Sequence, residues 1–359
     1  MKREKVNPVV SRWLLVGVVL VFFQVAIGGI TRLTDSGLSI TEWSVIQGTL
    51  PPLNVEEWEN AFNLYKVAAG KQYMSLHADM TLSGFKVIFF WEYFHRLWAR
   101  MMGFVFLIPF LIFMRKKMIP RWLLSRLGVV IALASAAAVF GWIMVASGLN
   151  DDNRTWVSAY KLVIHLMIAT SLLGYLFWTW LKSLGKTSAP GMHPNVGGLG
   201  VFTLVVLLLQ IVLGGLMAGM KAGLIHPHFP VFSNGRPFFE ALTDFQQLNT
   251  ENIVNYEPNL FVKSWVQLLH RVGAYVLAVL VVILGKKVLK TPGQKRLGML
   301  LFGLLGLQFI LGVITVVNSV GQIPVLWGAV HQMVALILWI TLLYTFYISR
   351  DSEIIVDKV

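Results

Sequence analysis

Residues 87–114 read VIFFWEYFHRLWARMMGFVFLIPFLIFM, an apolar run with one Glu, one His and two Arg in its first half. At about 1.5 Å per residue, a helix of this length can cross about 30 Å of hydrocarbon. A chain inside lipid must satisfy its own backbone hydrogen bonds, which favours a helix over an open strand. The stretch therefore predicts a membrane-spanning helix that carries ionisable side chains.

Seven further runs of similar character accompany it, near 13–31, 122–145, 159–181, 199–219, 263–284, 297–317 and 325–348. Of the 359 residues, 56% are hydrophobic and 13% are charged, whereas soluble proteins carry about 25% charged residues. The composition excludes an ordinary soluble enzyme and a disordered chain. We predict an all-α membrane protein with eight transmembrane helices.

The net charge of +13 is explained by membrane topology. Eighteen of the thirty Lys and Arg residues lie on one side, before the first run, at alternate connections or after the last run, together with only four acidic residues. The opposite loops carry nine Lys or Arg and twelve Asp or Glu. The positive-inside rule then places both termini in the cytoplasm and removes nucleic acid as a partner. Without a clear cleavage site or transit segment, the chain is expected in a bacterial cytoplasmic (inner) membrane.

The chain shows an internal repeat that predicts two four-helix halves, 1–190 and 191–359. The expected outer loops, 32–86, 146–158, 220–262 and 318–324, alternate between long and short. Three features of the first half recur in the second: Gln24-Val-Ala-Ile-Gly-Gly as Gln210-Ile-Val-Leu-Gly-Gly, His95-Arg96 as His270-Arg271, and His165 as His331. Four spans per repeat give both halves the same topology, so we expect two pseudo-symmetric bundles related by an axis along the membrane normal.

Four histidines are expected inside the spans at one depth. His95, His165, His270 and His331 lie six to nine residues from the outer ends of their runs, or about 9–13 Å deep. Ionisable residues inside a membrane are costly and usually functional. The alternative is that each imidazole only hydrogen-bonds a neighbouring helix. Their matched depth and matched repeat positions favour a functional layer of two pairs.

Paired imidazoles on facing helices suit the axial ligands of haem iron better than zinc or copper. Zinc and copper usually take three or four close ligands, and the chain has no cysteine. A four-helix bundle can hold a flat macrocycle between its helices. Glycines on the odd-numbered spans either leave room for a porphyrin or are ordinary helix contacts. These glycines are Gly28, Gly29, Gly214, Gly215 and Gly312.

Charged neighbours of the histidines predict different roles for the two halves. Arg96 and Arg271 could bind haem propionates, or extend to lipid headgroups. Glu92 lies three residues before His95, whereas Gln267 lies three residues before His270. A carboxylate can carry protons and an amide cannot, although Glu92 could instead only pair with Arg96. We therefore predict a reactive first half and a fixed electron-transfer or structural second half.

The outer loops give weaker expectations. The first loop should pack on the helix ends, and the histidines outside the spans should be solvated or at most form a poor metal site. The packing residues are expected to be Trp43, Trp58, Phe62, Leu64 and Tyr65. His77 and His193 are expected to be solvated. His226 and His228 could touch a metal, but two ligands in a loop are poor evidence for a metal site.

Several motifs, taken together, are similar to those of one known family. They are Gly28-Gly29-Ile30-Thr31-Arg32-Leu33-Thr34, Gly37-Leu38-Ser39-Ile40-Thr41-Glu42-Trp43, Pro51-Pro52-Leu53, the Phe85–Trp98 stretch with Glu92-x-x-His95-Arg96, His165, Val266–Arg271 and Trp327–His331. Over essentially its whole length the chain resembles the haem A synthase family. Some members carry cysteine pairs in the first and third outer loops. This chain has none and is more similar to a cysteine-free, mitochondrial-like branch.

The resemblance implies a chemistry and a set of roles. The family oxidises the C8 methyl of haem O to a formyl group, which gives haem A for cytochrome c oxidase. His270 and His331 match the ligands of a bound haem b, while His95 and His165, with Glu92 beside them, match the substrate haem pocket. Candidate protein partners are haem O synthase, assembly factors of cytochrome c oxidase and a second copy of the chain.

Two other functions fit parts of the pattern. A dihaem b-type cytochrome that takes electrons from quinol would need the same four histidines. The difference between Glu92 and Gln267 and the long outer loops weigh against it. A transporter built on parallel repeats would usually have interrupted helices at its site, and no proline interrupts a span near the histidines.

Overall fold

The computed structural model describes residues 6–41, 50–149, 154–185, 195–232 and 238–356. Within these ranges the chain is helical, with no strand. The helices are α1 (Pro8–Leu33), α2 (Val55–Ala68), α3 (Gly70–Leu76), α4 (Leu82–Arg115), α5 (Arg121–Leu149), α6 (Ala159–Ser183), α7 (Asn195–Gly219), α8 (Phe238–Thr243), α9 (Thr250–Val254), α10 (Leu260–Leu289), α11 (Lys295–Val317) and α12 (Val325–Val356).

Eight of the described helices are long and apolar enough to span a membrane, which confirms the predicted fold class: α1, α4, α5, α6, α7, α10, α11 and α12. Three of them, α1, α4 and α10, begin a few residues before the apolar runs, where polar side chains cap their N-termini. Asn7, Thr81 and Asn259 accept hydrogen bonds from the first-turn amides of α1, α4 and α10. The caps lie outside the hydrophobic runs, so hydropathy alone places the starts of these three helices too late in the chain.

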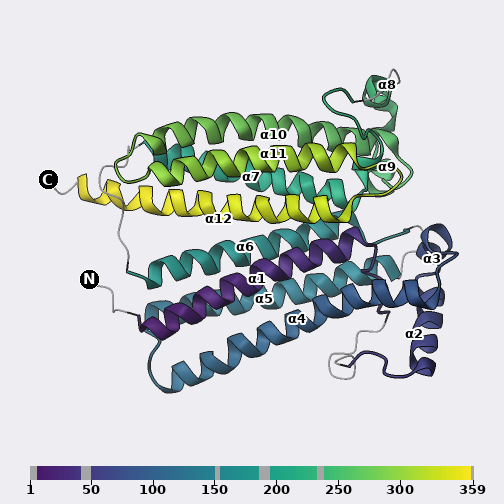
Figure 1. The fold of residues 1–359 in the computed structure, drawn as a ribbon, viewed down its shortest axis with the longest axis horizontal. Coiled ribbons are helices and arrows are strands. Elements are labelled where there is room, and N and C mark those ends of the chain that lie inside the picture. Colours follow the sequence, from purple (N-terminus) through teal and green to yellow (C-terminus); the bar gives the residue numbers. More distant parts are fainter. Residues whose placement is uncertain (1–5, 42–49, 150–153, 186–194, 233–237, 357–359) are drawn as a thin grey trace.

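The eight long helices run side by side, with both termini at the same end (Figure 1). Helices α1, α4, α5 and α6 form one group, and α7, α10, α11 and α12 form the other. The groups meet through α1 and α6 on one side and α7 and α12 on the other. The helices α4, α5, α10 and α11 therefore lie away from the junction.

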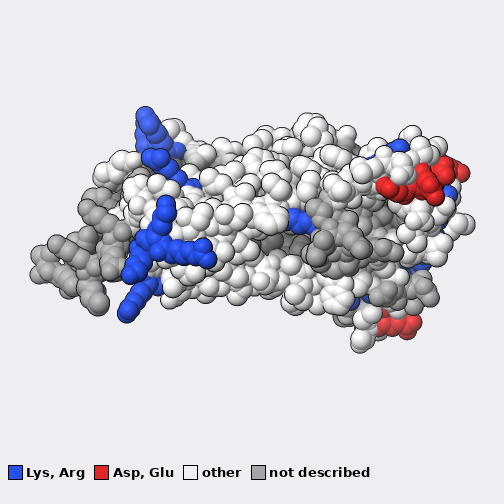
Figure 2. Space-filling model, turned by 90° about the horizontal axis from the view of Figure 1, so that it is seen from below, with Lys and Arg blue, Asp and Glu red and all other residues white. Residues whose placement is uncertain are grey.

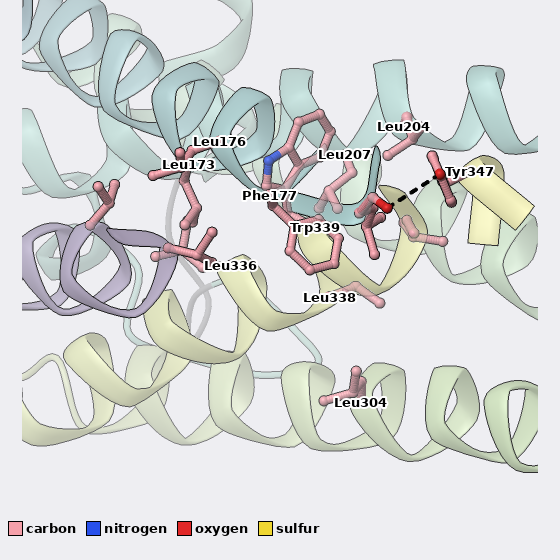
Figure 3. Packing of buried hydrophobic residues seen from close by; sticks show 14 of the residues in the cluster. Leu173, Leu176, Phe177, Leu204, Leu207, Leu304, Leu336, Leu338, Trp339 and Tyr347 are labelled. Atoms are coloured by element: carbon pink, nitrogen blue, oxygen red, sulfur yellow. Dashed lines mark hydrogen bonds between the residues drawn. The ribbon is translucent and has the colours of Figure 1, made fainter. Parts of the chain in front are cut away.

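An apolar core fills the junction between the two groups (Figure 3). Leu173, Leu176 and Phe177 of α6 pack near Leu336 and Trp339 of α12. Close approach is possible because α6 has a glycine there: a Cβ at Gly174 would lie 3.0 Å from Nε1 of Trp339. Since lipid is as apolar as leucine, such close van der Waals packing is what holds membrane helices together.

The two groups differ in how closely the two helices away from the junction pack against each other. Helix α10 packs along α11, whereas no comparable packing joins α4 to α5 in these fully described helices. In the most apolar 18-residue window of α10, 28% of the residues are buried, against 0% in that of α4. The four buried residues of α4 all lie near its N-terminal end: Phe85, Ile88, Phe89 and Glu92. The first group is therefore open to lipid along its α4 side.

The first outer loop packs on the helix ends, largely as expected. Phe62 and Tyr65 of α2 are buried against Phe85 of α4, and the Trp58 ring lies 5.0 Å from that of Phe89. The prediction was wrong for Leu64, which is 40% exposed because it lies on the outer face of α2. Trp43 lies outside the described residues.

The structure gives hydrogen-bond partners to two loop histidines, and it corrects the prediction for one of them, His77. Nδ1 of His77 lies 2.6 Å from the Tyr65 hydroxyl, so His77 belongs to the packed loop and is not simply solvated. His226 is buried, with Nε2 3.1 Å from the Ser264 hydroxyl. Burial, reinforced by Arg271, lowers the pKa of His226. His193 lies outside the described residues.

The charges separate along the molecule as counted from the sequence. Figure 2 shows a cluster of Lys and Arg towards the end that holds the termini. The acidic residues visible in the same view lie at the opposite end. The end with α2, α3, α8 and α9 is therefore the one that the positive-inside rule assigns to the outside.

Candidate functional site

Each of the four predicted histidines faces a glycine on the preceding long helix. A Cβ added at any of these glycines would lie 3.0–3.3 Å from an imidazole atom. The pairs are Gly28 with His95, Gly141 with His165, Gly214 with His270 and Gly312 with His331. These glycines give room to the imidazoles, so the four histidines point into the bundle and not out to lipid.

The second pair of histidines is spaced to share one metal atom. The ring centroids of His270 and His331 are 6.5 Å apart. Two imidazoles that each bind a metal at about 2 Å have ring centres about 6 Å apart. Within the described residues, no group of three or more His, Cys, Asp or Glu could hold a metal ion. The donor set thus fits two axial ligands of a haem better than a zinc or copper site.

The first pair is also brought together. His95 of α4 and His165 of α6 each face a glycine of a neighbouring helix in the same group of helices. Nδ1 of His165 and Nδ1 of His331 are buried, and neither has a hydrogen-bond partner within the described part of the chain. Buried ring nitrogens are rarely left unpaired, which is consistent with a bound group in both halves.

Glu92 is buried and takes three hydrogen bonds. It is 2% exposed and accepts from the Ser39 hydroxyl and the Ile40 amide, each at 2.8 Å, and from Arg96. The ion pair with Arg96 weighed from the sequence is therefore present. Arg96 also donates to the Ile40 carbonyl at 3.0 Å. Glu92 and Arg96 together hold the chain that leaves α1 against α4.

The second half repeats this arrangement with different chemistry. Gln267 and Arg271 both donate to the main-chain carbonyl of His226 at 2.9 Å. His226 lies 186 residues after Ile40, the same separation as between Gln24 and Gln210. The amide at 267 replaces the carboxylate at 92, so this half has no titratable group at that position.

Arg271 has a donor to spare for an anion. Its guanidinium lies 4.3 Å from the centre of the Phe232 ring, and its buried Nη1 has no hydrogen-bond partner among the described residues. A carboxylate of a bound ligand is the natural partner for such a group. Of the two arginines predicted to bind propionates, Arg271 has the clearer opening, because Arg96 already pairs with Glu92.

Sequence reasoning missed Gly141 and assigned no role to three glutamines. Gln24, Gln210 and Gln308 each lie four residues, or about one helical turn, before the glycine that faces a histidine. Their amide nitrogens contact His95, His270 and His331. The recurring Gln-x-x-x-Gly pattern is a signal that could have identified them.

Known proteins resemble the whole chain. The family described as cytochrome oxidase assembly protein matches residues 11–343. A heme A synthase from Flavobacterium psychrophilum is 38% identical over 348 residues, which cover 96% of this chain and 98% of the relative. Those from Flavobacterium johnsoniae and Caulobacter sp. are each 36% identical, covering 97% and 95% of this chain and 99% and 96% of the relatives.

This chain belongs to the haem A synthase family. The match spans the eight long helices and includes all four histidines. The eight long apolar helices indicate a multi-pass membrane protein, which agrees with the match to a family of cytochrome oxidase assembly proteins. Haem A synthase chemistry needs a site for a haem substrate, and the two inward-facing histidine pairs are the candidates for it.

Proposed function

We propose that the chain is a haem A synthase, which oxidises the C8 methyl group of haem O to a formyl group and so makes haem A. One observation carries the proposal. In a chain whose relatives along nearly its full length are heme A synthases, four histidines point inward against four glycines.

The second half is the proposed site of a resident haem b. His270 and His331 would be its axial ligands, supported by the 6.5 Å between their ring centroids. The spare Nη1 of Arg271 would bind a propionate. Packing of α10 on α11 closes this half, which suits a group that stays bound.

The first half is the proposed substrate site, with His95 and His165 as ligands of haem O. The open side along α4 supports this, because a substrate with a long apolar tail can enter from lipid without crossing water. Glu92, buried beside the pair, would take up and release protons during the reaction.

The reaction removes four electrons from the methyl carbon, and iron supplies the redox chemistry when bound. The protein has to orient the macrocycle, exclude water and move protons. The histidines would hold the macrocycle between the helices, and the glycines that face them leave room for the imidazole rings. Glu92 is the only acidic residue within the eight long apolar spans, which supports the proposal that it would exchange protons there.

We further propose that residues 1–190 and 191–359 are two repeats related by an axis along the membrane normal. The matched Gly–His contacts and the matched contacts of Ile40 and His226 support it. Both termini would be cytoplasmic, and the histidine layer would lie towards the periplasm. Haem O synthase, cytochrome oxidase assembly factors or a second copy would be met within this membrane.

Co-expression with a source of haem O, followed by chromatography of extracted haems, tests the function. We expect haem A from the wild type. Two unmodified b haems and no haem A would support the dihaem cytochrome, and absence of haem would support a transporter.

A further inference from the structure

The glutamine contacts are distributed unequally over the four histidines. The position one turn before the facing glycine is Gln24 for His95, Gln210 for His270 and Gln308 for His331. For His165 the same position is Ala137. Both histidines of the second half therefore have a glutamine neighbour, and in the first half only His95 has one.

The three amides make specific contacts. Nε2 of Gln210 donates to the main-chain carbonyl of His270 at 2.8 Å and lies 3.1 Å from Nδ1 of its ring. Nε2 of Gln308 lies 3.3 Å from Nε2 of His331. Gln24 contacts only the main-chain carbonyl of His95, at 3.3 Å. The rings of the second half are thus touched directly.

A neighbouring glycine leaves space for Gln210, and the side-chain oxygens of all three glutamines are buried. A side chain at Gly273 would collide with Oε1 of Gln210. The Oε1 atoms of Gln24, Gln210 and Gln308 are buried and have no partner within the described ranges. A carboxamide offers both a donor and an acceptor, so it can pair with either protonation state of a ring nitrogen. Such outer hydrogen bonds orient metal-bound histidines and tune their basicity.

We infer that Gln210 and Gln308 are positioning residues that lock the ligands of the resident haem, and that Ala137 makes His165 the releasable ligand of the substrate site. The inference rests on the proposed function. It explains how two similar histidine pairs hold one haem permanently and exchange the other. The open α4 side of the first half gives the released haem its path.

The test is haem release from the purified full-length protein to excess apomyoglobin, followed by absorbance. Gln308→Met and Gln210→Met keep the side-chain length but remove the amide. We expect each to release haem b about tenfold faster than the wild type. Ala137→Gln, loaded with haem O, should release it about tenfold more slowly. Wild-type release rates in these variants would overturn the inference.

A neighbouring glutamine provides the matched control. Gln332 follows His331, but its amide donates to the Val25 carbonyl of α1 at 2.9 Å. Gln332→Met should therefore release haem b at the wild-type rate. Release from this control as fast as from Gln308→Met would show a general packing effect and overturn the inference.

The midpoint potential of haem b separates positioning from packing. Gln308→Glu places a carboxylate acceptor beside the ring of His331 and makes the ligand more basic, so we expect a lower potential. An unchanged potential would contradict the role of Gln308. The proposed function is tested separately, and it fails if the wild type makes no haem A from haem O. The release rates are measured without turnover, so they do not depend on that result.

Discussion

Asp35 and Lys221 occupy matching positions 186 residues apart and form an ion pair with each other, at 2.8 Å. Each follows the first long helix of its half, and each has a left-handed backbone, with φ of 54° and 52°. Arg32 reinforces the link by donating to Asp35 at 3.1 Å and to the carbonyls of Ala218 and Gly219 at 2.9 and 3.0 Å. The two groups of helices are therefore joined, at the end where α1 and α7 finish, by polar contacts as well as by the apolar core.

Breaking this ion pair should destabilise the junction between the halves. Asp35→Asn leaves the partly buried ammonium of Lys221 without its carboxylate, which typically costs about 1–3 kcal/mol, whereas Lys221→Met costs less because Asp35 keeps its ion pair with Arg32. We expect a lower thermal unfolding temperature in detergent for each variant. The double variant should lose less than the sum of both. Additive losses would show that the two charges do not act as a pair.

Removing the charge of Glu92 should separate catalysis from haem binding. Glu92→Gln keeps oxygen acceptance from Ser39 and Ile40 but cannot carry a proton. We expect haem b to be retained and haem A to fall by about 100-fold or more, measured by chromatography of extracted haems. Gln267→Glu, the matching change in the other half, should leave haem A production intact. Normal haem A in Glu92→Gln would leave Glu92 with the anchoring role alone.

A side chain at Gly312 should displace the ligand His331. A Cβ there would lie 3.0 Å from Cε1 of His331, and valine adds two further methyl groups. We expect Gly312→Val to lose most of the haem b absorbance. Gly306→Val is the control on the same helix, because nothing lies within 4 Å of a Cβ at that position. Equal absorbance in the two variants would mean that the contact does not position the imidazole.

The first outer loop should loosen in mild acid. Burial lowers the pKa of His77 below its usual value near 6.5, Asp35 opposes the shift and Lys221 adds to it. Below the usual pKa of histidine, His77 binds a proton more readily in the unfolded loop than in the folded loop. The free energy of unfolding therefore falls as pH falls. Hydrogen exchange in α2 and α3, corrected for intrinsic rates, should rise between pH 7 and pH 5.

His77→Gln provides the control for this pH effect. The amide can still hydrogen-bond the Tyr65 hydroxyl, which also donates to Gln72 at 3.1 Å, but it does not titrate. Its exchange should depend on pH much less than that of the wild type. The same acid sensitivity in both proteins would assign the effect to another group.

The membrane helices and the inward histidines were predictable for a physical reason. A span needs about 20 apolar residues, and eight such runs stand out at once. His95, His165, His270 and His331 stand out because imidazoles are rare in such runs. The charge of the loops added the orientation that we propose.

The contacts around the histidines were not predictable in the same way. The spans are apolar on all sides, so periodicity does not reveal which face meets a neighbour. The contact of Gly141 with His165 depends on the rotation of two helices about their axes. The Asp35–Lys221 pair joins residues far apart in the chain. Packing decides which faces of the short loop helices are buried, which is why the predictions for Leu64 and His77 were wrong.

The most direct test of two distinct haem sites compares His270→Ala with His95→Ala in the full-length protein. We measure the haem b absorbance of each after purification, together with the haem A made from haem O. His270→Ala should lose the haem b spectrum, whereas His95→Ala should keep it and make no haem A. A haem b spectrum that persists in His270→Ala and disappears in His95→Ala would reverse the roles of the two halves and contradict the account.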